Sequence, residues 1–566
     1  MDKKRVVIWG AGRIGRGFIG DLFYNNNYAI TLIDEAKPLV DALKENRSYR
    51  VVRAISADQI ETIDIGEYEA LHTQEKDAIQ QAFNAASISA LAVYPKDFEA
   101  VAKRLQKHLI TRKDVNSSPM NILLCTNLMH AGPKFAEYLY AGLDTERKTA
   151  LEKMTGIIET LVIRICPSPP AEAVKEHPLI VWTNGYSVLP VDKSGFKGEI
   201  PNIPEMRLVE DMRAEEIRKI YTYNMCHAVL SYHGHLAGHE LLVECLADEK
   251  IKKEALGALE EVSQALQNTY HFNKKEMNEW IDGVLSHTNN PTIGDTVIRS
   301  AADPLRKLRH DDRLIGPALL CQASGVVPNH LIKAAAAAFL YQENSDEASK
   351  QLQLNIKNNG IEKTVMDVCG LRDDEKDLGD KIIGEFKMMQ NEITWQEKAE
   401  KAYELGFKYE KDYHGCGQSV VAAATEALDI FDDEVFNSAT GLCGGIGLDN
   451  QATCSSFTGG AMVIGMMFPR HRDQFGGDRE NKYTNFRLVQ ALRERVIQEY
   501  GTSYCYGIHG KLYGRAFDLR EKDEREAFEA AGGHGDHGCT EVVANISKWT
   551  VEIIGNEIIK QNNAGL

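Results

Sequence analysis

Short apolar runs alternate with helix-like segments along the first 200 residues of the chain. The apolar runs are rich in β-branched residues, and they cover residues 5–9, 29–33, 88–93 and 121–126. Strands that alternate with helices are typical of a parallel sheet with helices on its faces, because each parallel connection has to cross over the sheet. We therefore expect residues 1–200 to form an α/β domain.

The pattern changes near Pro204, where apolar residues begin to recur at spacings of three and four positions. This spacing predicts amphipathic helices. The segments that follow it most clearly are residues 215–236, 251–270, 395–408, 418–428 and 485–500. A charged stretch at residues 372–380 precedes a helix, and we take residues 391–395 beyond it as the seam before the last region. We predict an all-α substrate domain over residues 201–388 and an all-α domain over residues 389–566.

Length and charge narrow the range of functions. A chain of 566 residues is too long for one hydrophobic core. Its net charge of −17 opposes binding to nucleic acid, because the phosphates would have to be neutralised by clustered Lys and Arg. The best apolar run, residues 461–468, is far shorter than the roughly 20 residues that span a bilayer, and the start of the chain lacks the apolar segment of a secretion signal. We expect a cytoplasmic protein that binds neither nucleic acid nor membrane.

A glycine-rich turn follows the first predicted strand. Gly10, Gly12 and Gly15 have G-x-G-x-x-G spacing, which suits a tight turn, close approach of a pyrophosphate and close helix packing, respectively. The second predicted strand ends in Asp34, 19 residues after Gly15, where an acidic side chain receives the ribose hydroxyls of NAD and repels the 2′-phosphate of NADP. We predict a Rossmann-type NAD site, with an FAD site or a plain tight turn as alternatives. Its residues are Gly10, Ala11, Gly12, Arg13, Ile14, Gly15 and Asp34.

Three polar side chains share one face of the predicted helix at residues 215–236. At about 100° per residue, Lys219, His227 and Asn224 fall near 0°, 80° and 140°. Burial lowers the pKa of a lysine, and this suits it to act as a base for an alcohol. A surface lysine, an asparagine at a kink and a core histidine are the plain alternative. A zinc site is a further alternative, and its ligands would be His233, His235 and His239.

Several motifs together resemble the polyol-specific long-chain dehydrogenases over residues 4–388. They are the glycine run at residues 10–20, residues 196–206, the K-x4-N-x2-H motif at 219–227, residues 236–239 and residues 304–308. The resemblance implies that Lys219 is the general base, that Asn224 and Asn127 form an oxyanion hole, and that His227 orients the substrate. It implies no metal in this part of the chain.

One position departs from the family pattern. Many relatives have an Asp where this chain has Ile163, which puts the substrate and the proton relay in question. A basic stretch is a candidate phosphate clamp, or else a solvated helix face paired with Asp311 and Asp312, and its residues are Arg299, Arg306, Lys307, Arg309 and Arg313. Arg306 and Lys307 are the candidate phosphate contacts. Our working hypothesis is the reversible, NAD-dependent oxidation of D-mannitol 1-phosphate to D-fructose 6-phosphate. A free polyol or a hexuronate is the alternative substrate.

Five cysteines fall in the last third of the chain. They are Cys416, Cys443, Cys454, Cys505 and Cys539. Their glycine-rich surroundings resemble the family named for a C-GCAxxG-C-C pattern, whose members are held to be redox-active. A dithiol centre, a metal or iron–sulfur site assisted by His534 or His537, and plain buried cysteines remain open. The whole chain would then be an enzyme with an accessory redox module, or an NAD(H)-binding redox sensor. Nothing in the sequence specifies an oligomeric state.

Overall fold

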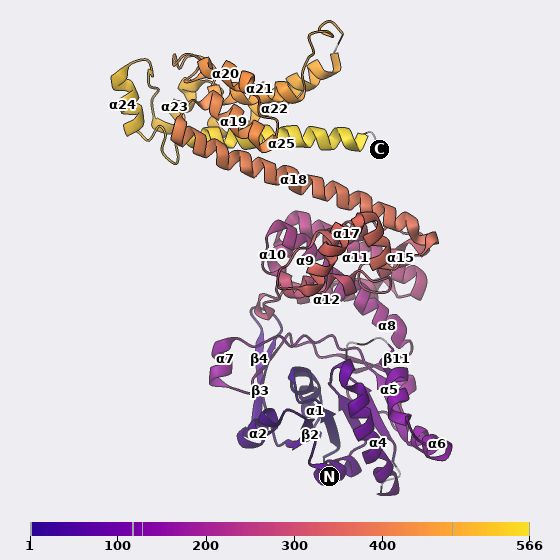
Figure 1. Ribbon diagram of the computed structural model, residues 1–566. Coiled ribbons are helices and arrows are strands. Elements are labelled where there is room, and N and C mark those ends of the chain that lie inside the picture. Colours follow the sequence, from indigo (N-terminus) through magenta and orange to yellow (C-terminus); the bar gives the residue numbers. More distant parts are fainter. Residues whose placement is uncertain (1–2, 116–117, 127, 129, 478, 565–566) are drawn as a thin grey trace. The chain divides into compact units, whose positions relative to one another are not determined.

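The computed structural model describes residues 3–115, 118–126, 128, 130–477 and 479–564 (Figure 1). Contacts between residues divide the chain into two compact units, Met1–Ile383 and Gly384–Leu566. The division into domains at residues 200 and 388 stays a prediction.

A six-stranded parallel sheet forms the base of the first unit. Its strands, in chain order, are β1 (Arg5–Trp9), β2 (Ala29–Asp34), β5 (Glu69–His72), β6 (Ile88–Leu91), β7 (Met120–Leu124) and β8 (Thr155–Glu159). They lie in the order β5-β2-β1-β6-β7-β8, with every neighbouring pair parallel. The order reverses direction beside β1, and in sheets of this kind ligands bind at that switch point. The predicted α/β fold is therefore confirmed.

Successive side chains of β1 point to opposite sides of the sheet. Both sets are buried, so the sheet has a core on each face. Val6 and Ile8 belong to one core, which includes side chains of α2 (Lys37–Asn46). Val7 and Trp9 belong to a second core. The second core is shared with α3 (Lys76–Ala85), α4 (Phe98–Val115) and α5 (Ala131–Tyr140).

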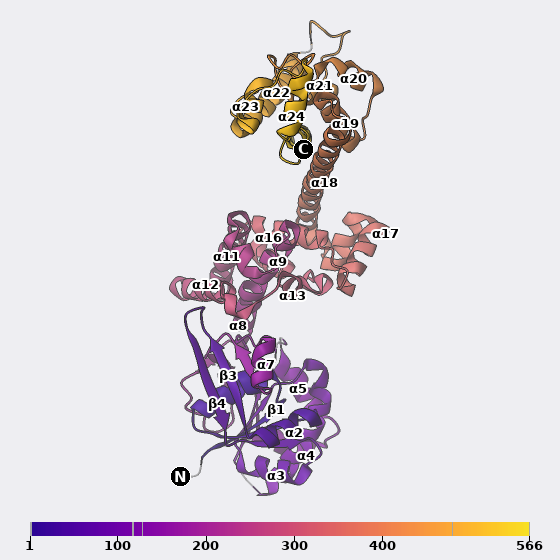
Figure 2. The same cartoon turned by 90° about the vertical axis from the view of Figure 1, so that its left-hand side faces the viewer.

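The sequence analysis did not anticipate two small sheets. One contains β3 (Ser48–Ala54), β4 (Ile60–Gly66) and β9 (Val181–Thr183), and the other contains β10 (Leu189–Asp192) and β11 (Met206–Val209). The β3–β4 hairpin lies on the side of the large sheet away from α3, α4 and α5 (Figure 2). Gly17 lets β9 approach closely, since a Cβ at Gly17 would lie 2.4 Å from Val181.

The rest of the first unit is helical, as the spacing of apolar residues predicted. The helices that build or flank the site are α8 (Met212–Lys219), η4 (Ile220–Asn224), α9 (Met225–Ala237), α11 (Glu249–Tyr270), α12 (Lys274–Thr288), α13 (Val297–Ala301), α14 (Pro304–Lys307) and α16 (Asn329–Leu340). Helix α9 is buried along most of its length, and α11, α13 and α16 pack against it.

The second unit is all-α apart from an isolated bridge between Thr453 and Tyr504, which agrees with the predicted fold class. Its helices are α18 (Lys376–Tyr413), α19 (Cys416–Leu428), α20 (Asp433–Ser438), α21 (Ser455–Met467), α22 (Arg479–Tyr500), α23 (Cys505–Tyr513), α24 (Lys522–Ala530) and α25 (Cys539–Ala564). Helix α18 begins before the boundary between the units, and residues 391–395 lie inside it. Among the described residues, no helix has both the length and the apolar character needed to cross a bilayer.

Candidate functional site

The glycine-rich turn between β1 and η1 (Gly15–Gly20) requires its glycines. Gly10 has a φ of +91°, and a Cβ there would lie 2.4 Å from the carbonyl oxygen of Ala92. A Cβ at Gly15 would lie 1.8 Å from the carbonyl oxygen of Gly10. A Cβ at Gly12 would meet nothing within 4 Å, so the space in front of the turn is open. The turn thus has the shape that a pyrophosphate needs, with a helical segment starting behind it.

Asp34 lies at the end of β2, directly beside this turn. Its Oδ2 accepts a hydrogen bond of 2.7 Å from the backbone N–H of Ala11, and its Oδ1 accepts one of 2.8 Å from Ala36. Arg13 is exposed and donates to the Ser168 hydroxyl at 2.9 Å. The structure therefore brings together the predicted cofactor-binding residues, and a carboxylate lies where a ribose would be received.

The predicted helix at residues 215–236 is interrupted by the wider turn η4, which has π-helical hydrogen bonding. Lys219 ends α8, Asn224 ends η4, and His227 lies in the first turn of α9. Each residue of a π turn rotates the chain by less than the roughly 100° of an α-helix, so Asn224 turns toward the face of Lys219. Sequence periodicity gave the shared face but missed the π turn, which often marks functional sites.

A cavity of about 460 Å³ contains all three side chains. Lys219, Asn224 and His227 line it together with Ile14 from the glycine-rich turn. Asn127, the other predicted oxyanion residue, lies outside the described residues. The amine, the amide and the imidazole therefore share one cavity with Ile14 of the candidate dinucleotide site.

The surroundings of Lys219 and His227 lower the pKa of both groups and so favour their neutral forms. Burial, helped by the positive charge of Arg313, lowers the pKa of Lys219 to about 8. Burial also lowers the pKa of His227 to about 4, against the opposing effect of Asp295. The Thr288 hydroxyl donates to the carbonyl of Val284, so it accepts from His227 Nε2–H at 3.1 Å. This assignment leaves His227 Nδ1 as a hydrogen-bond acceptor.

Cationic groups dominate one end of this cavity. Arg299, Arg306, Lys307 and Arg313 line it, whereas the fifth basic residue of the predicted stretch, Arg309, is exposed and is not part of the lining. Arg306, Arg313 and Arg299 pair with Asp303, Asp312 and Asp295, respectively. Burial lowers the pKa of Lys307 to about 7, and its Nζ donates to the carbonyl of Ala302. The cavity is thus suited to an anionic ligand.

Ile163, at the position where the family resemblance implied an acid, also lines the cavity. The neighbouring Arg164 is 4% exposed and pairs with Asp21 at 2.5 Å. Asp21 is fully buried and also pairs with Arg53 at 2.6 Å. The buried carboxylate beside this segment therefore comes from the first residue of α1 (Asp21–Asn25) and is paired with two arginines.

The three histidines of the zinc alternative have separate surroundings. His235 Nε2 lies 3.1 Å from the carbonyl oxygen of Gln342. His239 Nε2 lies 3.3 Å from the carboxylate of Asp248. Burial lowers the pKa of His233 to about 4. Within the part of the chain that the structure describes, no three His, Cys, Asp or Glu side chains are arranged to hold a metal ion.

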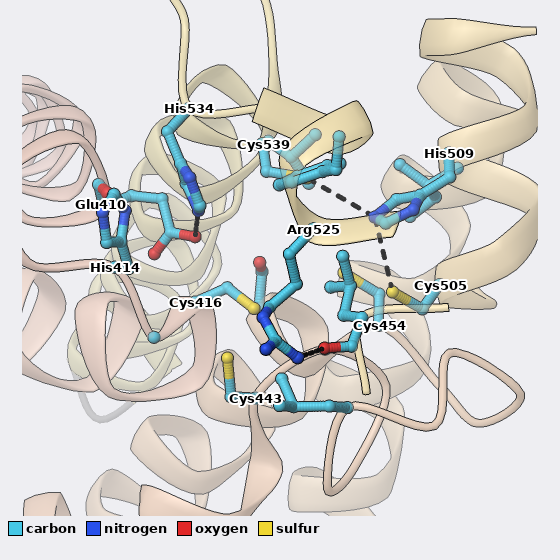
Figure 3. Close-up of a pocket in the computed structure, with 18 of the residues that line it drawn as sticks. Glu410, His414, Cys416, Cys443, Cys454, Cys505, His509, Arg525, His534 and Cys539 are labelled. Carbon is cyan, nitrogen blue, oxygen red and sulfur yellow. Dashed lines mark hydrogen bonds and ion pairs between the residues drawn. The ribbon is translucent and has the colours of Figure 1, made fainter. Parts of the chain in front are cut away.

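The second unit contains a cavity of about 240 Å³ that is lined by all five cysteines of its sequence pattern (Figure 3). All five are free thiols. Cys416, Cys505 and Cys539 are the first residues of α19, α23 and α25, and Cys454 directly precedes α21. The N-termini of four helices therefore contribute thiols to one cavity.

Only some of the other residues that line this cavity were predicted from the sequence. His534 lines it, while the side chain of His537 is 94% exposed. The sequence analysis missed His509, whose Nε2 lies 3.8 Å from the sulfurs of both Cys505 and Cys539. The four-residue spacing from Cys505 to His509 was the available signal, because such residues share a helix face.

Comparison with known families assigns both units. Residues 4–205 match the mannitol dehydrogenase Rossmann domain, and residues 211–383 match the mannitol dehydrogenase C-terminal domain. Residues 414–553 match the family described as "Putative redox-active protein (C_GCAxxG_C_C)".

Two curated relatives cover the first unit. A mannitol-1-phosphate 5-dehydrogenase of Caldanaerobacter subterraneus subsp. tengcongensis is 31% identical over 378 residues, which is 67% of this chain and 96% of the relative. The same enzyme of Oceanobacillus iheyensis is 31% identical over 390 residues, which is 69% of this chain and 99% of the relative.

Two solved structures share the fold of this unit. A D-sorbitol dehydrogenase in substrate-free form has a TM-score of 0.59 at 17% identity and covers 69% of this chain and 93% of its own. Pseudomonas fluorescens mannitol 2-dehydrogenase, in a ternary complex with NAD and D-mannitol, has a TM-score of 0.55 at 14% identity and covers 69% and 92%.

Proposed function

Because the chain belongs to the mannitol dehydrogenase family over residues 4–383, we propose that it oxidises a polyol phosphate with NAD, with Lys219 as the general base. D-mannitol 1-phosphate, oxidised reversibly to D-fructose 6-phosphate, is the proposed substrate. The observation that carries this proposal is the single cavity that contains Lys219, Asn224, His227 and Ile14 of the glycine-rich turn.

The glycine-rich turn and Asp34 fit NAD. The open space at Gly12 and the helical segment behind it would receive the pyrophosphate, and the Asp34 carboxylate would receive the ribose hydroxyls. When bound there, NAD supplies the hydride acceptor for the carbinol carbon. The 2′-phosphate of NADP would meet the negative charge of Asp34, so we assign NAD as the cofactor.

Lys219 is the proposed general base, which removes the proton of the substrate hydroxyl. Its neutral amine accepts the proton of the substrate hydroxyl, because its lowered pKa makes the neutral form available near pH 8. The side-chain amide of Asn224 donates to the same oxygen as negative charge develops there. His227, held through Nε2 by Thr288, presents Nδ1 as an acceptor for a neighbouring substrate hydroxyl. Asn127 is proposed as a second donor from the family resemblance alone.

The phosphate is assigned to the cationic end of the cavity. Arg306 and Lys307 are the proposed contacts, since both line the cavity and the Arg306 guanidinium can donate two parallel hydrogen bonds. A free polyol offers these cations no charge partner, so binding energy is lost when the phosphate is absent.

The test is a panel of free and phosphorylated hexitols with NAD and NADP, followed by absorbance of the reduced cofactor. We expect the phosphorylated substrate and NAD to be preferred. In Arg306→Ala the preference for the phosphorylated hexitol should fall by about 10-fold. This value lies in the lower part of the range for hydrogen bonds to charged groups, because Arg306 is partly exposed to solvent. Arg309→Ala, an exposed arginine outside the lining, is the matched control and should keep the preference. Equal turnover of free and phosphorylated hexitols would refute the phosphate assignment.

A further inference from the structure

Four of the five cysteines that line the cavity of the second unit fall into two pairs. Cys416, at the start of α19, lies close enough to Cys443 for the two thiols to interact (Figure 3). Cys505 and Cys539 lie instead on either side of His509 Nε2, at 3.8 Å each. Cys416, Cys443 and Cys539 are partly exposed, whereas Cys454 and Cys505 are buried. Cys416 and Cys443 therefore form an accessible pair at the cavity wall.

The two thiols of this pair are not equivalent. The interaction with Cys416 and with the backbone N–H groups at the start of α19 lowers the pKa of Cys443, although burial opposes the change. The same interaction, together with burial, raises the pKa of Cys416. These opposite shifts favour Cys443 over Cys416 as the thiolate, which is the nucleophilic form.

A buried carboxyl group faces the same space. Glu410 is 2% exposed and lines the cavity, and its Oε2 has no hydrogen-bond partner among the residues that the structure describes. Burial raises the pKa of Glu410 to about 8, so the group carries a proton at neutral pH. His534 Nε2 lies 3.7 Å from the other carboxyl oxygen (Figure 3). Glu410 can thus give and take a proton inside the cavity.

The rim of the cavity carries a positive charge. Arg525 is exposed, lines the cavity and extends into it in Figure 3. Its neighbours Arg515 and Arg520 pair with Glu524 and Asp518, whereas the Arg525 Nη1 donates to the backbone carbonyls of Leu519 and Arg520. A guanidinium beside four helix N-termini favours a ligand that carries a carboxylate.

We propose that this cavity performs thiol–disulfide exchange with a low-molecular-weight disulfide bearing a carboxylate, with Cys443 as the attacking thiolate and Cys416 as the resolving thiol. The volume of about 240 Å³ admits a small organic molecule and far exceeds what hydrogen peroxide needs. The proposal is independent of the polyol activity.

The chemistry balances without a further reactant. The Cys443 thiolate attacks one sulfur of the disulfide, a new S–S bond forms, and the departing thiolate takes the proton of Glu410. Cys416 then gives its proton to the Glu410 carboxylate and attacks the Cys443 sulfur, which releases the second half of the molecule as a thiolate. The small disulfide is reduced by two electrons, and the Cys416–Cys443 pair is oxidised by two.

The experiment uses the reduced full-length chain, with oxidised glutathione as the probe and no NAD or polyol present. We expect Cys443 to be the first cysteine to carry a glutathionyl group in the wild-type chain, as read by peptide mass spectrometry, and the end product to be a Cys416–Cys443 disulfide. This readout needs no variant. Its failure would leave the polyol proposal untouched, because no step of that reaction is measured.

Variants separate the two roles. Cys416→Ser should accept one glutathionyl group on Cys443 and stop there, while Cys443→Ser should react at least about 100-fold more slowly, since a thiol at its usual pKa is mostly protonated at pH 7. Cys505→Ser, in the same cavity, is the matched control and should react within about 3-fold of wild type. Circular dichroism of each variant confirms the fold.

A neutral probe tests the rim. Arg525→Gln should slow the reaction with oxidised glutathione by about 10-fold and leave the reaction with 2-hydroxyethyl disulfide unchanged, because only the first probe carries carboxylates. Equal slowing of both probes would overturn the carboxylate assignment. Wild-type reactivity of Cys443→Ser would overturn the exchange proposal, and so would a stoichiometric metal that blocks the thiols until it is chelated.

Discussion

Replacing Lys219 with methionine is expected to lower kcat/KM for polyol phosphate oxidation by about 10²–10⁴-fold, the usual contribution of a general base. Methionine keeps the length and the apolar stem of lysine, so the wall of the cavity stays filled. The loss should appear in kcat with little change in NADH affinity, because Lys219 is assigned to proton removal and the cofactor to the glycine-rich turn. Initial rates and NADH fluorescence titration measure the two quantities.

Lys253→Met is the control for this substitution. Lys253 is an exposed lysine of α11 outside the cavity, and its loss should leave kcat/KM within about 3-fold of wild type, as for most surface substitutions. A Lys219→Met variant that binds NADH normally and keeps its turnover would show that another group is the base. It would also favour a sensor role for the first unit.

The second large effect concerns stability. Asp21→Ala is expected to lower the free energy of unfolding of the first unit by about 3–5 kcal/mol, the usual cost of leaving a buried charge without its partner. Asp21 is fully buried and pairs with Arg53 and with Arg164, which is itself 4% exposed. The substitution removes the carboxylate from both arginines, and it leaves the buried Arg164 with only the backbone carbonyls of Tyr186 and Gly17 as partners.

Asp64→Ala is the matched control, because Asp64 also pairs with an arginine, Arg50, at 2.8 Å, but on the surface. Its loss should cost no more than about 1 kcal/mol. Denaturant unfolding of the two variants, with NAD absent, gives the comparison. Equal changes for Asp21→Ala and Asp64→Ala would mean that the buried cluster contributes no more than a surface pair.

Local chemistry made much of the dinucleotide site predictable. Gly15 is required by its contact with the carbonyl of Gly10, and Gly10 is required by its positive φ and by the carbonyl of Ala92, which follows the neighbouring strand β6. The spacing of the glycines was enough to locate the turn. Asp34 followed from its position at the end of the second strand. The alternation of apolar runs likewise gave the parallel sheet, since strand and helix differ in hydrophobic period.

Other features depend on distant parts of the chain. The residues of the π turn η4 follow the same hydrophobic pattern as an α-helix, so the periodicity of the sequence could not reveal the turn. Arg164 and Asp21 are far apart in sequence and meet only because η1 packs against the segment after β8. Cys416, Cys454, Cys505 and Cys539 come together because four helices begin around one cavity, and no short motif encodes that convergence.

The most direct test of the assigned proton transfer is the pH dependence of kcat/KM in both directions. Oxidation needs the neutral amine of Lys219 and reduction needs its ammonium form, and the pKa of Lys219 is lowered to about 8 by burial. The pKa of His227, about 4, and the second pKa of the substrate phosphate, about 6, lie below this window. Lys307, whose pKa is about 7, titrates close to the window, but its charge acts on phosphate binding and therefore changes oxidation and reduction in the same direction. We expect oxidation to rise with pH and level off above about 8, and reduction to fall over the same interval. Profiles that are flat there, or that change in the same direction, would contradict the role of Lys219.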